Sequence, residues 1–210
     1  PSRGLGDVYK RQILDVYVDD FLLQAKDGPI RTNLLKAISE TWKMGKDAVL
    51  TIHQSLTFLG IEIVLKKDGE VYLHQEPFVD SLLKKYGMDT GNSNKCVQIG
   101  QVPTQPDLPT PAVLKQLQGF SGEFNWLATR TRSDLSYITS VLASSCSQFA
   151  AWSEELARKV LKYLAGHRDI GVTITCSGDP SDVRVYTDAG FAGFSNRSQT
   201  GIVITWAGTV

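Results

Sequence analysis

The pattern of hydrophobic and polar residues predicts two β-hairpins in the first third of the chain. Residues 13–25 place β-branched and aromatic residues on both sides of an acidic pair, which is typical of two strands joined by a tight turn. Residues 56–65 and 70–74 form a second such pattern around a Lys-Asp-Gly turn at 67–69. We therefore expect one strand over 56–65 and its partner over 70–74.

Helical spacing of apolar residues predicts five helices. One begins at Pro29 and another runs from Pro77 to Gly87, since proline suits the first turn of a helix and glycine its end. Three more patterns follow, and the last of them is capped by Ser153 and ends at Gly166. The expected inward positions are Ile30, Leu34, Ala37, Ile38 and Thr41; Phe78, Val79, Leu82, Leu83 and Tyr86; Leu114, Leu117, Phe120, Phe124 and Leu127; Leu135, Ile138, Val141, Leu142 and Cys146; and Leu156, Val160, Tyr163 and Leu164.

Strands are expected again near the end, over 183–188 and 200–206, so the fold class is α+β. Between the hairpins and the later helices, residues 89–112 carry four prolines, which exclude regular structure over much of that stretch. This segment is the expected internal boundary.

Composition changes this picture little. The chain has 210 residues, 42% hydrophobic and 21% charged, which is enough for one or two small cores. Its formal net charge of zero argues mildly against tight nucleic-acid binding by this chain alone. Cys96, Cys146 and Cys176 are far apart and odd in number, so neither a disulfide framework nor a zinc site is indicated, and a reducing intracellular compartment suits them. No apolar run approaches a membrane span.

The three histidines, His53, His74 and His167, are isolated in the sequence. We expect them to be surface or strand-end residues rather than metal ligands.

Chemistry is expected first at the turn of the first hairpin, where Asp19 and Asp20 follow Tyr17 and Val18. Two adjacent carboxylates repel each other, and a divalent cation removes that repulsion. Hard oxygen ligands suit Mg²⁺, and two such ions about 4 Å apart catalyse nucleotidyl transfer. On these two residues alone a solvated turn is the favoured interpretation, because Asp is common in turns.

Tyr-Val-Asp-Asp after an apolar strand resembles the catalytic signature of reverse transcriptases. Further blocks resemble, in order and spacing, the polyproteins of copia-type LTR retrotransposons. These blocks are residues 58–63, 68–75, 78–88, 131–137, 152–166 and 186–201.

The resemblance implies a division of the chain. Residues 13–88 correspond to the C-terminal part of a reverse transcriptase palm, with catalytic and primer-grip hairpins. A Pro-rich linker at 89–112 and a helical connection region at 113–180 follow, and 181–210 form the start of a ribonuclease H-like domain. The primer grip is assigned to Phe58, Leu59, Gly60 and Ile61.

The resemblance also implies the chemistry. Asp19, Asp20 and Asp188 are the expected catalytic and metal-binding residues, flanked in the hairpin by Tyr17 and Val18. The parent would be an RNA-directed DNA polymerase that binds two Mg²⁺ ions, an RNA template, a DNA primer, RNA–DNA hybrid and deoxynucleoside triphosphates. Its expected location is an intracellular retroelement particle in the cytoplasm or nucleus, with no membrane partner.

The first twelve residues do not fit the resemblance. Residues 7–12 match the translation of a common sequencing adapter, so 1–12 are interpreted as a non-native tail. Because the family also uses an upstream aspartate and further downstream acidic residues, this chain alone is expected to be inactive.

Two alternatives stay open at this point. The family usually has Asp-Trp where this chain has Gly190-Phe191, and Pro where it has Ser133. These departures suit an inactive retroelement remnant that at most binds nucleic acid or has a structural part. A third reading is an unrelated α/β binding protein with a fortuitous Tyr-Val-Asp-Asp.

Overall fold

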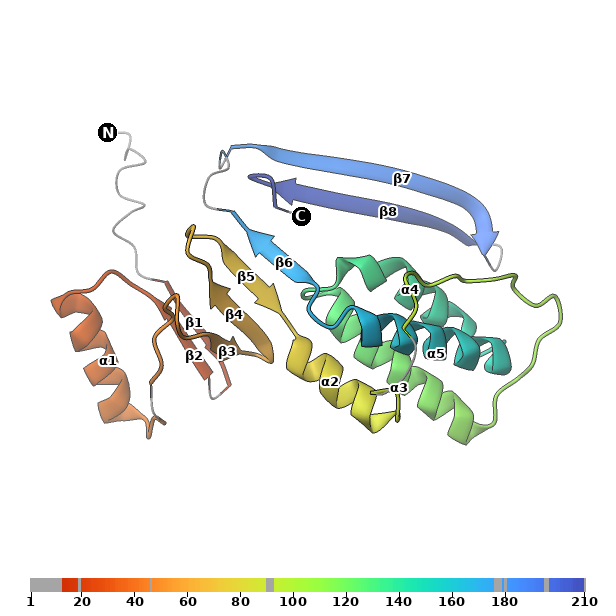
Figure 1. Cartoon of the computed structure of the whole chain (residues 1–210), viewed down its shortest axis with the longest axis horizontal. Coiled ribbons are helices and arrows are strands. Elements are labelled where there is room, and N and C mark those ends of the chain that lie inside the picture. The colour runs from red at the N-terminus through yellow and green to blue at the C-terminus, as the bar shows by residue number, and fades with distance from the viewer. Residues whose placement is uncertain are drawn as a thin grey trace.

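The first hairpin forms as expected in the computed structural model, which describes residues 13–18, 20–45, 47–89, 93–175, 179, 181–194 and 197–209. Strand β1 (Ile13–Tyr17) pairs antiparallel with β2 (Asp20–Gln24), and Tyr17 lies opposite Asp20 at the closed end. The register places Asp20 directly beside the turn. Both strands lie at one end of the elongated molecule (Figure 1).

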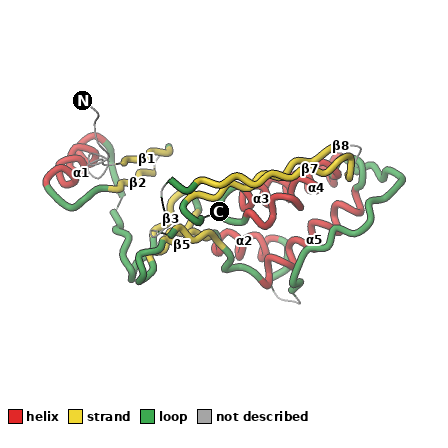
Figure 2. Tube along the Cα trace, turned by 90° about the horizontal axis from the view of Figure 1, so that it is seen from above, coloured by secondary structure: helices red, strands yellow, loops and turns green. Residues whose placement is uncertain are grey.

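Helix α1 (Pro29–Thr41) begins at the expected proline, but its predicted buried stripe is wrong. Ile38 is buried and Leu34 half-buried, whereas Ile30 is 70% exposed and Ala37 and Thr41 are also exposed. The helix lies beside the first hairpin and away from the other helices (Figures 1 and 2). Few neighbours are therefore available to cover it, and an amphipathic pattern alone does not supply them.

A four-stranded antiparallel sheet forms the middle of the molecule. Its strands are β3 (Leu56–Phe58), β4 (Ile61–Leu65), β5 (Val71–His74) and β6 (Gly171–Ile174), in that order across the sheet. The prediction of one strand over 56–65 is wrong, because the chain reverses at Leu59 and Gly60. Strand β6 was not predicted, since its four residues show no pattern until they pair with β5.

The main hydrophobic core lies among four helices: α2 (Glu76–Lys85), α3 (Pro111–Ala128), α4 (Ser136–Ser145) and α5 (Ala150–Gly166). A 3₁₀ turn, η2 (Ser133–Leu135), precedes α4. The apolar stripes predicted for these helices are confirmed. The buried cluster contains Val79, Leu82, Leu83, Leu117, Phe120, Phe124, Leu127, Leu135, Ile138, Val141, Leu142, Cys146, Leu156, Ala157, Val160, Leu161 and Leu164.

The Pro-rich segment carries no helix or strand over 93–110, as expected, and α3 begins at Pro111 with the Thr110 side chain as its cap. Val97, Ile99 and Val102 pack against the helical core. That core combines α2, which precedes the segment, with α3 to α5, which follow it. The segment therefore does not separate two hydrophobic cores within the part of the chain that the structure describes.

Ser153 is not the cap of α5, which begins three residues earlier, after Phe149. The Ser153 side chain is buried, and its hydroxyl lies 3.0 Å from that of Ser145 on α4. The serine therefore joins two packed helices rather than ending one of them.

Substituting Ser153 tests whether it caps α5 or packs between α4 and α5. Ser153→Asn is expected to lower the free energy of unfolding by about 1–3 kcal/mol, because the larger side chain overfills a packed site. Asparagine is as good a cap as serine, so a capping role predicts no loss. Urea denaturation of the variant, with Ser144→Asn on the less buried side of α4 as the control, measures the difference.

The chain closes with a long two-stranded ribbon, β7 (Val183–Phe194) and β8 (Arg197–Trp206), whose register shifts between Gly190 and Phe194. Both predicted strands are present and longer than expected. Small antiparallel sheets and separate helices confirm the α+β class. No helix in the described ranges is long and apolar enough to cross a membrane.

Candidate nucleic-acid site

The tip of the first hairpin is exposed and strained. Val18 occupies the turn with φ +50° and is 79% exposed, and Tyr17 and Asp20 are exposed beside it. A β-branched residue in the left-handed region is a conformational outlier. Such outliers concentrate at functional sites, where surrounding structure holds them.

This strain can be tested on the chain itself. Val18→Asn is expected to stabilise the closed hairpin by about 1 kcal/mol, since asparagine tolerates the left-handed region better than valine. Slower hydrogen exchange of the Asp20 amide, in the turn-closing pair with Tyr17, reports the change. Val16→Asn, at an extended position opposite Phe21, serves as the control and is expected to speed that exchange, because asparagine is poor in strands.

Asp20 can serve as a metal ligand. Its carboxylate forms no side-chain hydrogen bond or ion pair with any described residue, so its oxygens are accessible at the hairpin tip. A carboxylate of this kind fits Mg²⁺, which takes one or two protein carboxylates and completes its shell with water and phosphate. Asp19, the other member of the predicted pair, lies outside the described residues. Among those that are described, no three His, Cys, Asp or Glu side chains cluster around a metal-sized space.

The four residues assigned to the primer grip form a second tight turn. Phe58 pairs with Ile61, and between them Leu59 and Gly60 have φ +53° and +71°. Two consecutive positive φ values are typical of the two-residue turns that match strand twist. The sequence contains only one turn-forming residue here, which is why a continuous strand was expected.

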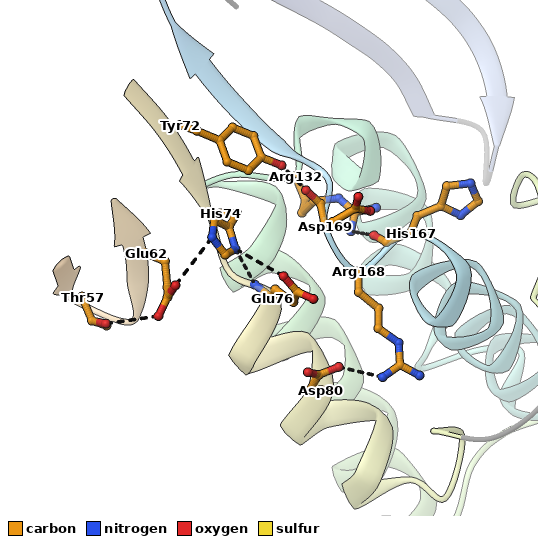
Figure 3. Close-up of polar contacts among 10 residues, drawn as sticks. All are labelled: Thr57, Glu62, Tyr72, His74, Glu76, Asp80, Arg132, His167, Arg168 and Asp169. Carbon is orange, nitrogen blue, oxygen red and sulfur yellow. Dashed lines mark hydrogen bonds and ion pairs between the residues drawn. The ribbon is translucent and has the colours of Figure 1, made fainter. Parts of the chain in front are cut away.

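A row of polar side chains crosses the sheet directly behind this turn (Figure 3). Glu62 on β4 lies opposite Thr57 on β3 and opposite His74 on β5. The Thr57 hydroxyl donates to Glu62 Oε1 at 3.4 Å, and His74 Nε2 lies 3.6 Å from Glu62 Oε2. Glu62 thus contacts both neighbouring strands.

His74 is the residue that sequence reasoning interpreted least well. It ends strand β5, as expected, but it is buried rather than on the surface. Its Nδ1 accepts the backbone N–H of Glu76 at 3.4 Å, so the imidazole joins the sheet to the start of α2. Its isolation in the sequence gave no signal, because both partners approach it through strand pairing and the strand–helix junction.

Asp188, the third predicted catalytic residue, lies on strand β7 of the β7–β8 ribbon. It is exposed on β7 opposite Gly201, and its Oδ1 accepts the N–H of Ala189 at 2.9 Å. The β7–β8 ribbon lies over the helical part of the molecule, whereas the β1–β2 hairpin lies at its far end (Figures 1 and 2). The two predicted acidic sites are therefore separate.

Arg130, Arg132, Arg158 and Lys162 are basic residues of the helical region that could contact phosphate by their charge. Arg130, Arg158 and Lys162 are exposed. Arg132 is unavailable, because it is 1% exposed and its guanidinium forms two hydrogen bonds with Asp134 and one with the His167 carbonyl. The charge of Arg132 is visible in the sequence, whereas its burial is visible only in the fold.

Comparisons with known proteins agree with the motifs. The chain is 29% identical over 198 residues to the retrovirus-related Pol polyprotein from transposon RE2 of Arabidopsis thaliana. This match covers 91% of the chain and 12% of that protein. It is 24% identical over 207 residues to the retrovirus-related Pol polyprotein from transposon TNT 1-94 of Nicotiana tabacum, covering 93% of the chain and 15% of the relative. It is 28% identical over 192 residues to a putative transposon Ty5-1 protein of Saccharomyces cerevisiae, covering 90% of the chain and 58% of that protein.

The chain is thus similar, over about nine-tenths of its length, to retrovirus-related Pol polyproteins of transposons. This confirms the expected resemblance to copia-type polyproteins. The chain spans 12% and 15% of the length of the two plant relatives. No protein-family model matches the chain, and no solved structure matches it.

Proposed function

We propose that this chain is the segment of a retrotransposon RNA-directed DNA polymerase that contains its catalytic hairpin and primer grip, together with the start of a ribonuclease H domain. The observation that carries the proposal is the Tyr-Val-Asp-Asp hairpin. It presents Asp20 in the open at a strained turn, in a chain similar throughout to Pol polyproteins. A solvated turn alone does not account for the ordered similarity of the remaining chain.

In this proposal Asp19 and Asp20 hold Mg²⁺ beside the primer terminus. The metal supplies activation of the attacking hydroxyl and stabilisation of the leaving oxygen. The hairpin's own contribution is to hold the Asp20 carboxylate away from other protein groups, so that its charge is available to the ion. The exposed ring of Tyr17, directly across from Asp20, offers an apolar surface at the same tip.

The turn of residues 58–61 is proposed to hold the primer's 3′ end, with RNA as template and deoxynucleoside triphosphates as substrates. Asp188 is proposed as one metal ligand of a separate ribonuclease H site that acts on RNA–DNA hybrid. Its exposed position on a β-ribbon supports a role as ligand, and its distance in the fold from the first hairpin supports a second site.

The proposal is tested with a longer Pol polyprotein that contains this segment. Template-dependent primer extension on RNA that requires Mg²⁺ is the expected result. Absence of extension from a folded protein would favour the inactive-remnant interpretation, and binding of RNA–DNA hybrid without extension would identify that remnant as a nucleic-acid-binding protein.

A further inference from the structure

The turn assigned to the primer grip, residues 58–61, joins strands β3 and β4 of the four-stranded sheet. Polar side chains of this sheet contact one another directly next to the turn. Thr57 and Glu62 are the first residue pair after the turn-closing pair Phe58 and Ile61. Glu62 is on the second of the four strands and accepts contacts from both sides, from Thr57 and from His74. A carboxylate held by two neighbouring strands restricts the movement of one strand against the other.

The row formed by Thr57, Glu62 and His74 also borders strand β6. His74 pairs with Gly171, and a Cβ at Gly171 would overlap the Leu73 carbonyl oxygen and touch the His74 side chain. The glycine therefore lets β6 approach the side chains of His74 and Tyr72 closely. The Tyr72 ring stacks on that of His74, with 5.3 Å between the ring centroids, and the Tyr72 hydroxyl donates to the Asp169 carbonyl.

The row is anchored to the helical core as well. His74 Nδ1 accepts the N–H of Glu76, the first residue of α2, whose buried face belongs to the main core. With Nδ1 as acceptor, the neutral imidazole carries its proton on Nε2, the nitrogen that faces Glu62. His74 thus contacts the first residue of α2 through one ring nitrogen and Glu62 on β4 through the other (Figure 3).

We propose that Glu62 and His74 are positioning residues for the turn of residues 58–61, fixing it relative to α2 so that it can hold a primer terminus. The assignment of a primer to that turn rests on the proposed function above. The structural part, that this pair sets the conformation of the turn, stands independently of it.

The structural part is tested by NMR spectroscopy of the 210-residue chain, with the Gly60 amide as reporter. Glu62→Ala and His74→Phe are expected to shift the Gly60 resonance. The phenylalanine keeps the ring stacked on Tyr72 but removes both nitrogens. Glu62→Gln can keep both contacts, because its carbonyl oxygen accepts from His74 Nε2 and its amide donates to the Thr57 hydroxyl oxygen, and it is expected to retain the wild-type resonance.

Two further variants keep the test decisive. Thr57→Val removes one contact at an exposed position, so it reports on the row even where Glu62→Ala fails to fold. Glu70→Ala breaks the ion pair with Lys66, 3.3 Å away near the opposite end of β4 and β5, and is expected to leave the Gly60 resonance unchanged. An equal shift in this control, or no shift in Glu62→Ala, would overturn the positioning role.

The functional part is tested by binding of an RNA–DNA hybrid with a recessed DNA 3′ end to the same proteins. Glu62→Ala is expected to weaken binding roughly tenfold, since small displacements of a positioning element are costly, whereas Glu62→Gln and Glu70→Ala bind as the wild type does. If the wild-type chain does not bind the hybrid, the primer assignment fails and the NMR result still decides the positioning role. If Glu62→Ala shifts the Gly60 resonance but binds the hybrid as well as the wild type does, the positioning role stands and the assignment of the primer to this turn fails.

Discussion

Asp20→Asn, introduced into a longer Pol polyprotein containing this segment, is expected to reduce Mg²⁺-dependent primer extension on the order of a thousandfold. The amide keeps the size and shape of the carboxylate but removes the negative charge that holds a divalent cation. Because Asp20 is exposed and bonds no described side chain, the substitution removes no internal contact. The free energy of unfolding of the 210-residue chain is expected to change by less than about 0.5 kcal/mol.

The matched control is Asp15→Asn. Asp15 is an exposed carboxylate on the same hairpin, on β1 opposite Leu22 and away from the turn. Its replacement is expected to leave extension within a few-fold of wild type. Retained extension in Asp20→Asn would remove this residue from the mechanism, and an equal loss in both variants would indicate a general charge effect rather than a metal ligand.

The largest expected effect on stability is at Arg132. Arg132→Met is expected to lower the free energy of unfolding by about 2–4 kcal/mol, because it removes a buried guanidinium that makes three charge-assisted hydrogen bonds. The guanidinium donates to both Asp134 oxygens, at 3.0 and 2.8 Å, and to the His167 carbonyl at 2.8 Å. Removing it leaves the partly buried Asp134 with only the Tyr163 hydroxyl as a side-chain donor.

Urea denaturation at neutral pH measures this effect. The control is Arg158→Met on the same helical bundle, where the arginine is 60% exposed and pairs with Glu154 one turn away. Exposed pairs of this kind contribute at most about 1 kcal/mol. A small loss in Arg132→Met, comparable to that in Arg158→Met, would show that methionine packing replaces the ion pair.

The same pair makes stability depend on pH. Burial alone raises the pKa of Asp134, but the hydrogen bond and charge of Arg132, with the Tyr163 hydroxyl, together hold that pKa below its ordinary value of 3.8. A carboxyl whose pKa is lower in the folded state stabilises the fold above its unfolded pKa, and this contribution is lost as pH falls through the folded pKa. The difference in stability between wild type and Arg132→Met is therefore expected to narrow as the pH falls below 3.8 and through the lower pKa of folded Asp134. A difference that stays constant would place the effect in packing rather than charge.

Sequence alone identified most elements and the candidate site. The Tyr-Val-Asp-Asp motif, the Asp-Gly turn and the apolar stripes of α2 to α5 are local features, and each is present where it was expected. The resemblance to Pol polyproteins also came from short motifs in order, and the comparisons agree with it.

The errors share one cause, which is dependence on partners far away in the chain. Strand β6 forms only because Val71 pairs with Ile174, and α1 exposes its stripe because little of the chain covers it. The sequence predicted Ser153 as the cap of α5, whereas in the fold its hydroxyl lies against that of Ser145 on α4.

The polar groups show the same division. Sequence determined which residues are ionisable, namely Asp20, Glu62, His74 and Arg132, but not which of them are accessible. Strand pairing placed His74 against Glu62, and the fold buried Arg132, whose partner Asp134 is only two residues away in the sequence. Local propensity and turn chemistry act within a few residues and are therefore readable from sequence, whereas burial and ion pairing depend on contacts that only the tertiary structure brings together.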